Sequence, residues 1–365
     1  MEQLPLSEGL AAEDASAWQE LAFQPQAPAE LASQDAASQT SPVLSDYDRI
    51  VVFNSGGKDS IACVLHLLEL GVDPSKLELH HHDIDGQEGS TLMDWPITRS
   101  YCEAFAKSFG LKMYFSWKVG GFEGELLREN QRTAPIAWQR EDGTIASVGG
   151  DGGKEATRRK FPQVCADLRT RWCSAYLKID VGARILTTEP RFLQGKTLVV
   201  TGERAQESSA RARYKTFEPD RADNRSGARV KRWIDHWRPV HAWDESQVWD
   251  ILRRHGVNPH PAYWLGWGRT SCLACIFGSA NQWASVRAVA PAKFERIAQL
   301  EEAFGVTIHR KYTVRQLADM GTPYPMDAAA AELAMSEVYP IELLRMDPAF
   351  WKHPPGAFGE STGPT

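Results

Sequence analysis

The sequence predicts an α/β fold with a doubly wound, mainly parallel sheet. Short runs of β-branched and aromatic residues recur along the chain, and stretches with the apolar content of packed helices separate them. Strands that alternate with helices form βαβ units, whose strands run parallel. A loop with two adjacent glycines joins the first predicted strand to the first predicted helix. Ligands of such sheets bind outside the carboxyl ends of the strands, so this loop is a candidate binding site.

The regular elements follow in order. Residues 49–54 (RIVVFN) form the first predicted strand, and residues 59–70 (DSIACVLHLLEL) form the first predicted helix. A second helix is predicted at residues 94–109, and three further strands at residues 77–82, 112–116 and 197–201. Three stretches lack such regularity. We expect an insertion or lid at 120–153, a mobile basic loop at 203–238 and a frayed end at 353–365.

Length and composition indicate a globular protein. The chain has 365 residues, of which 42% are hydrophobic and 10% aromatic, enough to bury a sizeable core. It contains no run of eighteen apolar residues and no signal-peptide pattern at its start. We therefore expect a soluble, cytoplasmic protein without a membrane partner. Six cysteines in such a chain favour metal binding, catalysis or simple burial over a disulfide framework.

The charge is unevenly distributed. Residues 1–46 hold eight acidic side chains and no Lys or Arg, so the net charge of -6 resides in this segment. Its Ala, Gln, Ser and Pro content predicts a disordered acidic tail. We expect three parts, namely this tail, a nucleotide-binding domain at 47–280 and a C-terminal helical extension at 281–365.

The glycine loop reads Ser55-Gly56-Gly57-Lys58-Asp59-Ser60. A strand, a glycine turn and a helix start direct backbone N–H groups and the positive end of a helix dipole at one point, which suits a phosphate. Ser55 and Ser60 add hydroxyl donors, and Lys58 adds a positive charge. Asp59 can hold Mg²⁺ or cap the helix.

This SGGKDS loop after an apolar strand resembles the pyrophosphate loop of the adenine-nucleotide α-hydrolase superfamily, also called the PP-loop ATP pyrophosphatases. Further motifs are similar to its phosphoadenylyl-sulfate reductase branch: Arg171 to Lys178 (RWCSAYLK), Gly202 to Arg211 (GERAQESSAR), Trp237 to Trp249, and Asn258 to Tyr263. The resemblance implies an adenine-nucleotide site at Ser55, Gly56, Gly57, Lys58, Asp59, Ser60, Asp83, Asp85, Lys178, Gly202, Arg204, Glu207, Ser208 and Arg211, with Lys58 and Asp59 catalytic.

Spacing within these motifs has its own chemical meaning. Arg204 and Arg211 lie three residues before and four residues after Glu207, so on a helix one face would present two guanidinium groups held by one carboxylate. Such groups suit phosphate or sulfate, although ion pairs on a solvated face would give the same pattern. His80, His81 and His82 alternate between the faces of a strand, so we expect packing and hydrogen bonding there and not one metal site.

Four cysteines are candidate metal ligands. Cys272 and Cys275 form a C-x-x-C pair, Cys173 lies in the RWCSAYLK motif, and Cys165 stands eight residues before it. Four thiolates can hold a [4Fe–4S] cluster or Zn²⁺, and some members of the resembled family carry such a cluster. The family's Cys-Cys doublet is replaced by Cys173-Ser174 here, so the fourth ligand and the metal itself stay open. Cys63 and Cys102 lie in helical stretches and are expected to be buried.

Three functions remain open at this stage. The first is a DndC-like enzyme that cleaves ATP with pyrophosphate release and activates an acceptor for sulfur transfer. The second is a sulfonucleotide reductase, although no cysteine follows Cys275 to act as the usual C-terminal nucleophile. The third is a nucleotide-binding protein without turnover. Basic stretches at 154–178 and 203–238 are compatible with a nucleic-acid partner, and a sulfur-donor protein is the other candidate partner.

Overall fold

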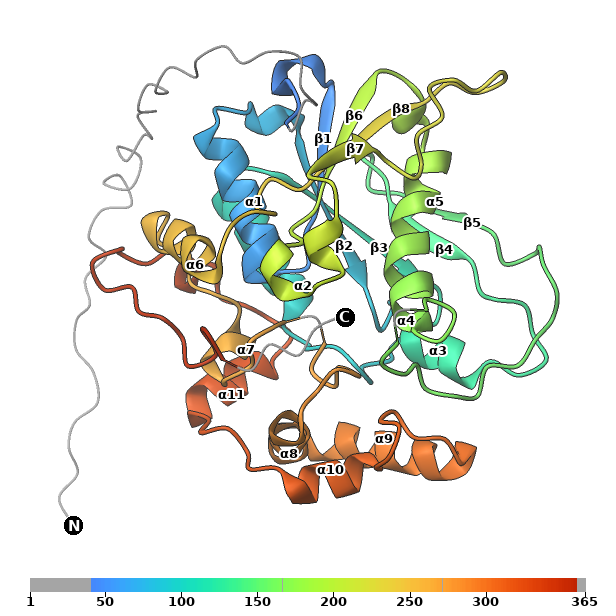
Figure 1. Cartoon of the computed structure of the whole chain (residues 1–365), viewed down its shortest axis with the longest axis vertical. Coiled ribbons are helices and arrows are strands. Elements are labelled where there is room, and N and C mark those ends of the chain that lie inside the picture. Colours follow the sequence, from blue (N-terminus) through green and yellow to red (C-terminus); the bar gives the residue numbers. More distant parts are fainter. Residues whose placement is uncertain (1–40, 166, 271, 360–365) are drawn as a thin grey trace. The chain divides into compact units, whose positions relative to one another are not determined.

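The computed structural model describes residues 41–165, 167–270 and 272–359 (Figure 1). These residues belong to one compact unit, which runs from residue 38 to residue 365. Of the tail expected at residues 1–46, residues 1–40 lie outside the described part of the chain. The boundary expected at residue 280 remains a proposal. Buried residues from Tyr47 to Trp351 share one hydrophobic cluster, so the core continues across this position.

One sheet of eight strands forms the centre, in the order β5-β4-β3-β2-β1-β6-β8-β7. Strands β3, β2, β1, β6 and β8 run parallel, and antiparallel strands extend the sheet at both edges. This order confirms the predicted doubly wound, mainly parallel fold. The strands are β1 (Arg49–Phe53), β2 (Leu77–Asp83), β3 (Lys112–Lys118), β4 (Ile136–Gln139), β5 (Ile145–Val148), β6 (Lys196–Val200), β7 (Phe217–Pro219) and β8 (Trp233–Trp237).

Helices cover both faces of this sheet. Figure 1 shows α1 on one side of the strands and α5 on the other. The α-helices are α1 (Lys58–Glu69), α2 (Thr98–Ser108), α3 (Gly121–Leu127), α4 (Trp172–Ser174), α5 (Asp180–Thr188), α6 (Glu245–Arg254), α7 (Pro261–Trp264), α8 (Ala280–Val289), α9 (Pro291–Phe304), α10 (Val314–Met320) and α11 (Ala328–Ala334). Shorter turns are η1 (Leu44–Asp46), η2 (Pro74–Lys76), a π-helical turn η3 (Ala175–Ile179), η4 (Pro190–Leu193), η5 (Ala205–Glu207), η6 (Arg211–Arg213) and η7 (Ile341–Leu343).

Alternating side chains of the central strands explain why both faces need cover. Ile50 and Val52 of β1 join the larger hydrophobic cluster on the side of α1, whereas Val51 joins a second cluster on the side of α5. All three side chains are fully buried. Because successive strand residues point to opposite faces, such a strand requires a helix layer on each side.

Three expectations about irregular segments are wrong. The stretch 120–153 contains α3 and the β4–β5 hairpin, whose Ile136 and Trp138 are buried, so it is not a free lid. The stretch 203–238 contains β7 and β8, so it is not one continuous loop. Residues 353–359 are not frayed, because Pro354 and Gly356 are buried against the core.

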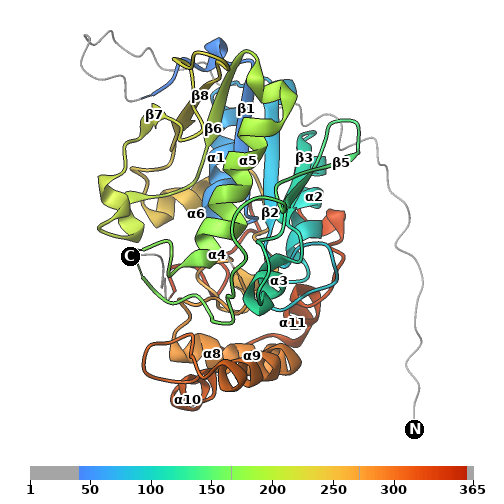
Figure 2. The ribbon, with the colours of Figure 1, turned by 90° about the vertical axis from the view of Figure 1, so that its right-hand side faces the viewer.

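Helices α8, α9 and α10 pack on one another at a distance from the sheet (Figure 2). Glu301 of α9 is 3% exposed and accepts hydrogen bonds from the N–H groups of Ile308 and Val314, which fixes the turn into α10. Among the described residues, no helix is both long and apolar enough to cross a membrane.

Candidate functional site

The glycine loop forms the turn between β1 and α1, as the sequence predicts. Gly56 has a φ of 73°, a left-handed conformation that L side chains rarely adopt. Asn54 directly precedes the loop and stabilises it through its side chain, a role that the sequence did not predict. Its Oδ1 accepts hydrogen bonds from the N–H of Gly56 at 3.0 Å and from the Ser60 hydroxyl at 3.0 Å. The loop is therefore shaped by its own side chains before any ligand arrives.

Lys58 is 3% exposed and lies among carboxylates. Its Nζ is 3.4 Å from Asp59 Oδ2 and 3.7 Å from Glu245 Oε1, and it donates to the carbonyl oxygen of Gly268 at 3.3 Å. Burial disfavours the ammonium form, but Asp59, Tyr263 and Glu245 outweigh burial and raise the pKa of Lys58. Lys58 therefore keeps its positive charge next to the loop amides.

Asp59 is shared by two cations. Arg204 Nε donates to Asp59 Oδ1 at 2.6 Å, and Lys58 lies on the other carboxylate oxygen. Burial would raise the pKa of Asp59, but Lys58 and Arg204 together lower it, so this carboxylate is ionised. Gly202 lies against the backbone of Asp59. A Cβ at this position would come within 2.8 Å of the Asp59 carbonyl carbon.

The expected helical face at Arg204, Glu207 and Arg211 is not formed. Residues 205–207 and 211–213 are separate short turns, so the three side chains do not share a helix. Glu207 accepts from the backbone N–H of Arg204 and pairs with the side chain of Arg211. The Arg204 guanidinium turns instead to the phosphate loop. Ser208 holds the second turn by accepting from the N–H of Arg211 at 3.2 Å.

Asp83 is the last residue of β2 and Asp85 follows it, so both lie at the carboxyl end of this strand. Asp83 pairs with Arg99 at 2.9 Å. Asp85 is 8% exposed and accepts from the N–H groups of Met93 and Asp94, so its carboxylate fixes the chain after β2. Burial raises the pKa of Asp85 despite these two hydrogen bonds.

The three histidines of β2 each have a separate partner, as expected from strand alternation. His80 lies 3.3 Å from Glu78, His81 Nδ1 lies 2.9 Å from the carbonyl oxygen of Asn54, and His82 Nδ1 lies 2.8 Å from the Ser116 hydroxyl. Burial is the main cause that lowers the pKa of all three, so they are neutral near pH 7.

Three of the four candidate cysteines interact electrostatically. Burial and then the neighbouring Cys275 raise the pKa of Cys173 to about 11. Burial is also the main cause that raises the pKa of Cys272. Lys178 acts against this shift, whereas Cys275 and Cys173 add to it. Cys165 is half-buried. Within residues 41–165, 167–270 and 272–359, no three His, Cys, Asp or Glu side chains are arranged to hold a metal ion as they stand. Cys63 and Cys102 are fully buried, as expected.

Two site residues are identified by the structure alone. Glu245, at the start of α6, is the second carboxylate next to Lys58. Tyr263, in α7, places its hydroxyl oxygen 3.0 Å from the backbone N–H of Lys58. They lie 187 and 205 residues beyond Lys58 in the chain, so only the tertiary fold brings them to the loop. In the sequence, Tyr263 is part of the Asn258 to Tyr263 motif, but the motif did not indicate what this side chain does.

Comparison with known proteins places this site in context. A family model described as the phosphoadenosine phosphosulfate reductase domain matches residues 158–277. An uncharacterized 37.8 kDa protein in the gpa 5′ region of Escherichia phage 186 is 32% identical over 264 residues, which cover 69% of this chain and 74% of the phage protein. An adenosine 5′-phosphosulfate reductase of Allochromatium vinosum is 31% identical over 94 residues, 25% of this chain and 33% of the reductase. The crystal structure of Candida glabrata FMN adenylyltransferase in complex with FAD and inorganic pyrophosphate matches with a TM-score of 0.35 and 13% identity, over 85% of this chain and 81% of that one.

Proposed function

The chain belongs to the phosphoadenosine phosphosulfate reductase family, and from that premise we propose that it binds ATP or a related adenine nucleotide and cleaves it with release of pyrophosphate. The observation that carries the proposal is the glycine loop at the carboxyl end of β1, with the charged Lys58 at the first turn of α1. Loop amides and a helix start are suited to bind phosphate oxygens.

The proposed chemistry is electrostatic. An acceptor oxygen forms a bond to the α-phosphorus, the bond from that phosphorus to the bridging oxygen breaks, and pyrophosphate leaves with the electron pair. Lys58 and the loop amides would stabilise the charge that develops on pyrophosphate. Mg²⁺ held by Asp59 would neutralise the same oxygens. The other proposed nucleotide contacts are Ser55, Gly56, Gly57, Ser60, Asp83, Asp85, Lys178, Gly202, Arg204, Glu207, Ser208 and Arg211.

A sulfur-handling metal centre is the second part of the proposal. Cys173, Cys272 and Cys275 would supply three thiolates to a [4Fe–4S] cluster or to Zn²⁺, with Cys165 as the fourth. The mutual electrostatic influence of the first three cysteines supports this grouping. We propose that sulfur from a sulfur-donor protein in the cytoplasm then forms a bond to the activated acceptor, as in DndC-like proteins. The bond from the acceptor to its adenylated oxygen breaks, and AMP leaves with that oxygen and the electron pair. A nucleic acid is the proposed acceptor class.

A reductase of phosphoadenylyl sulfate or adenylyl sulfate is the alternative, and the similarity to the Allochromatium vinosum reductase favours it. One observation opposes it. Residues 276–365 contain no cysteine, the residue type whose thiolate attacks the sulfonucleotide in such reductases.

Product analysis separates these activities. Anaerobically prepared protein is incubated with Mg²⁺ and either ATP or phosphoadenylyl sulfate, and pyrophosphate, AMP and sulfite are measured. The proposal predicts pyrophosphate and AMP from ATP, and no sulfite from phosphoadenylyl sulfate supplied with reduced thioredoxin. Sulfite release would favour the reductase. Nucleotide binding without any product would favour a non-catalytic nucleotide-binding protein.

A further inference from the structure

Four backbone N–H groups of the phosphate loop, those of residues 55–58, already have partners in the protein. Three of them are satisfied inside the loop: Ser55 N donates to Ser60 Oγ at 3.2 Å, Gly56 N to Asn54 Oδ1 at 3.0 Å, and Gly57 N to Ser55 Oγ at 3.3 Å. The fourth partner comes from a distant segment. Lys58 N donates to the Tyr263 hydroxyl at 3.0 Å. A phosphate oxygen could accept a hydrogen bond from this N–H only if it displaced the tyrosine oxygen.

The segment that begins with Tyr263 covers the loop. The Gly268 carbonyl oxygen accepts a hydrogen bond from Lys58 Nζ at 3.3 Å, so this segment also contacts the Lys58 ammonium group. Thr270 closes the other side, because a Cβ built on Gly57 would lie only 2.7 Å from its hydroxyl oxygen. Tyr263 and Thr270 are 1% and 3% exposed. Residues 263–270 therefore form a cover over the phosphate loop.

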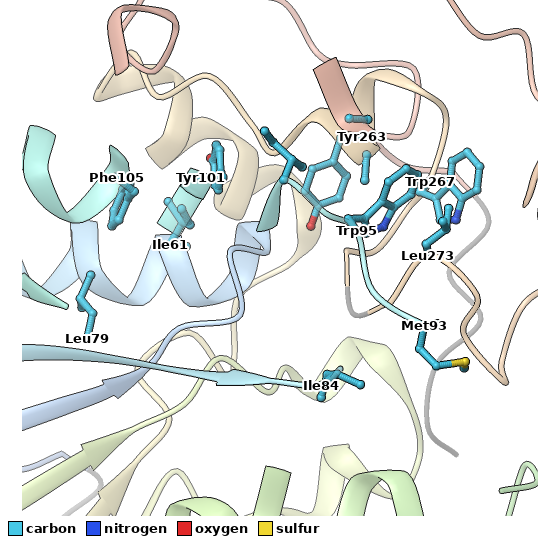
Figure 3. Close-up of a cluster of buried hydrophobic side chains, with 14 of the residues drawn as sticks. Ile61, Leu79, Ile84, Met93, Trp95, Tyr101, Phe105, Tyr263, Trp267 and Leu273 are labelled. Atoms are coloured by element: carbon cyan, nitrogen blue, oxygen red, sulfur yellow. The ribbon is translucent and has the colours of Figure 1, made fainter. Parts of the chain in front are cut away.

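A second segment holds this cover in place. The N–H of Gly356 donates to the Tyr263 carbonyl oxygen at 2.8 Å, and the N–H of Phe358 donates to Glu245 Oε1 at 3.3 Å. A Cβ at Gly356 would lie 2.2 Å from the Trp267 carbonyl oxygen, so the two backbones are in direct contact. Figure 3 shows Tyr263 beside Trp95 and Trp267 in the buried cluster, with its hydroxyl directed out of that cluster.

We propose that Tyr263 is a positioning residue of the nucleotide site, whose hydroxyl occupies a phosphate-oxygen position in the free protein and leaves it when the nucleotide binds. The inference rests on the proposed function, because it concerns the same loop. The proposal defines two states. In the closed state the Lys58 N–H donates to the Tyr263 hydroxyl, and in the open state it donates to a phosphate oxygen. Because only the open state binds, the closed state weakens the apparent affinity.

Pyrophosphate binding to the full-length protein tests this competition. Tyr263→Phe keeps the buried ring and removes only the hydroxyl, which leaves the Lys58 N–H unpaired in the closed state. We expect pyrophosphate to bind about threefold to tenfold more tightly to this variant by calorimetry, since one hydrogen bond contributes roughly 0.5–1.5 kcal/mol net. A tyrosine with only a structural role would leave the affinity unchanged. A tyrosine that binds the phosphate itself would give weaker binding.

Tyr47→Phe is the matched control. It removes another buried tyrosine hydroxyl, which donates to Asp235 at 2.8 Å near the opposite ends of the strands. This variant should lose some thermal stability and bind pyrophosphate as the wild type does.

Gly356→Ala tests the cover without altering the loop. The added methyl group displaces residues 356–358 from the cover, so the closed state is destabilised and pyrophosphate affinity should again rise. Equal affinity of the wild type and both variants would overturn the inference while leaving the proposed function intact. Failure of folded wild type and folded variants alike to bind pyrophosphate or ATP would overturn both.

Discussion

Lys58, Asp59 and Arg204 form a charged group in which each member depends on the others. Lys58 and Arg204 are each 3% exposed, and Asp59 is the carboxylate that both contact. Burial of a charge is tolerated only when a partner of opposite sign is close. Asp59, which the sequence predicts to be catalytic, therefore also stabilises the structure of the loop.

Removal of Asp59 should test this dual role. Asp59→Ala leaves the two buried cations without their shared partner, so we expect the free energy of unfolding to fall by about 3–5 kcal/mol. Urea unfolding at pH 7 measures the change. Asp250→Asn serves as control because its ion pairs with Arg253 and Arg254 are exposed, and it should cost less than about 1 kcal/mol. A loss in Asp59→Ala no larger than that of the control would contradict the account.

His260 should make the protein sensitive to acid. It is fully buried, its Nδ1 accepts from the N–H of Ala262 at 3.1 Å, and burial lowers its pKa to about 3. The unfolded chain gains a proton on this histidine below about pH 6.5, whereas the folded protein stays neutral there. The unfolded state thus binds more protons, and stability falls as the pH drops from about 6.5 towards 3.

His260→Asn isolates this contribution because asparagine can still cap α7 but does not titrate. Between pH 7 and pH 4.5, the wild type should lose more stability in urea unfolding than the variant, by about 1–3 kcal/mol. Parallel pH profiles of the two proteins would show that His260 is not the source of the acid sensitivity.

At the scale of secondary structure, the central βαβ units could be predicted and the sheet edges could not. Strands β1 and β6 consist mainly of apolar residues and are largely buried, so composition reveals them. Strands β2 (LELHHHD) and β3 (KMYFSWK) also carry polar side chains, and each follows a predicted helix. The edge strands β5 and β7 are only four and three residues long and partly exposed. Each pairs with the strand next to it in the sequence, β5 with β4 and β7 with β8, but the glycines and charges around these short strands resemble loops. The predicted helix at 94–109 starts only at Thr98, after a turn that contains Pro96.

Contact between the end of β6 and the first turn of α1 yields a prediction at this scale. Gly202 lies against the Asp59 backbone, and a Cβ there would be 3.0 Å from the Ser60 nitrogen. Gly202→Ala should therefore displace the phosphate loop and weaken ATP binding at least about tenfold, because misplaced loop amides lose their alignment with phosphate. Gly152→Ala is the control, since no heavy atom lies within 4 Å of its Cβ position. Unchanged ATP affinity in Gly202→Ala, measured by calorimetry, would refute the argument.

At the scale of the whole molecule, the site consists of segments that only the tertiary fold joins. The sequence could predict the loop at 55–60 because strand, glycines and helix are contiguous. It could not predict Glu245, Tyr263 or the cover at 263–270, because their roles arise from contacts across about 190 residues or more of chain. The same reason explains why Arg204 was expected on a helical face and instead pairs with Asp59.

The proposed metal centre also joins distant parts of the chain, because Cys173 and Cys272 lie about 100 residues apart. Anaerobically purified protein should contain iron and be brown if the four cysteines hold a cluster, and should contain about one zinc per chain if they hold Zn²⁺. Cys173→Ser and Cys272→Ser should each lose most of the metal, whereas Cys63→Ala, a change at a fully buried cysteine in α1, should retain it. Metal analysis that shows equal content in Cys165→Ser and wild type would remove Cys165 from the ligand set. Absence of metal from the wild type would leave the ATP pyrophosphatase activity as the whole proposal.

The most direct test of the central claim is the rate of pyrophosphate release from Mg²⁺-ATP in wild type and Lys58→Ala. We expect release by the wild type and a rate at least about tenfold lower in Lys58→Ala, because a charge at this position contributes a few kcal/mol to the stabilisation of departing pyrophosphate. Lys107→Ala, a change at an exposed lysine of α2, should keep the wild-type rate, and all three proteins should be compared for thermal stability. Wild-type release in a folded Lys58→Ala variant would contradict the assignment of the loop at 55–60 as the site of nucleotide cleavage.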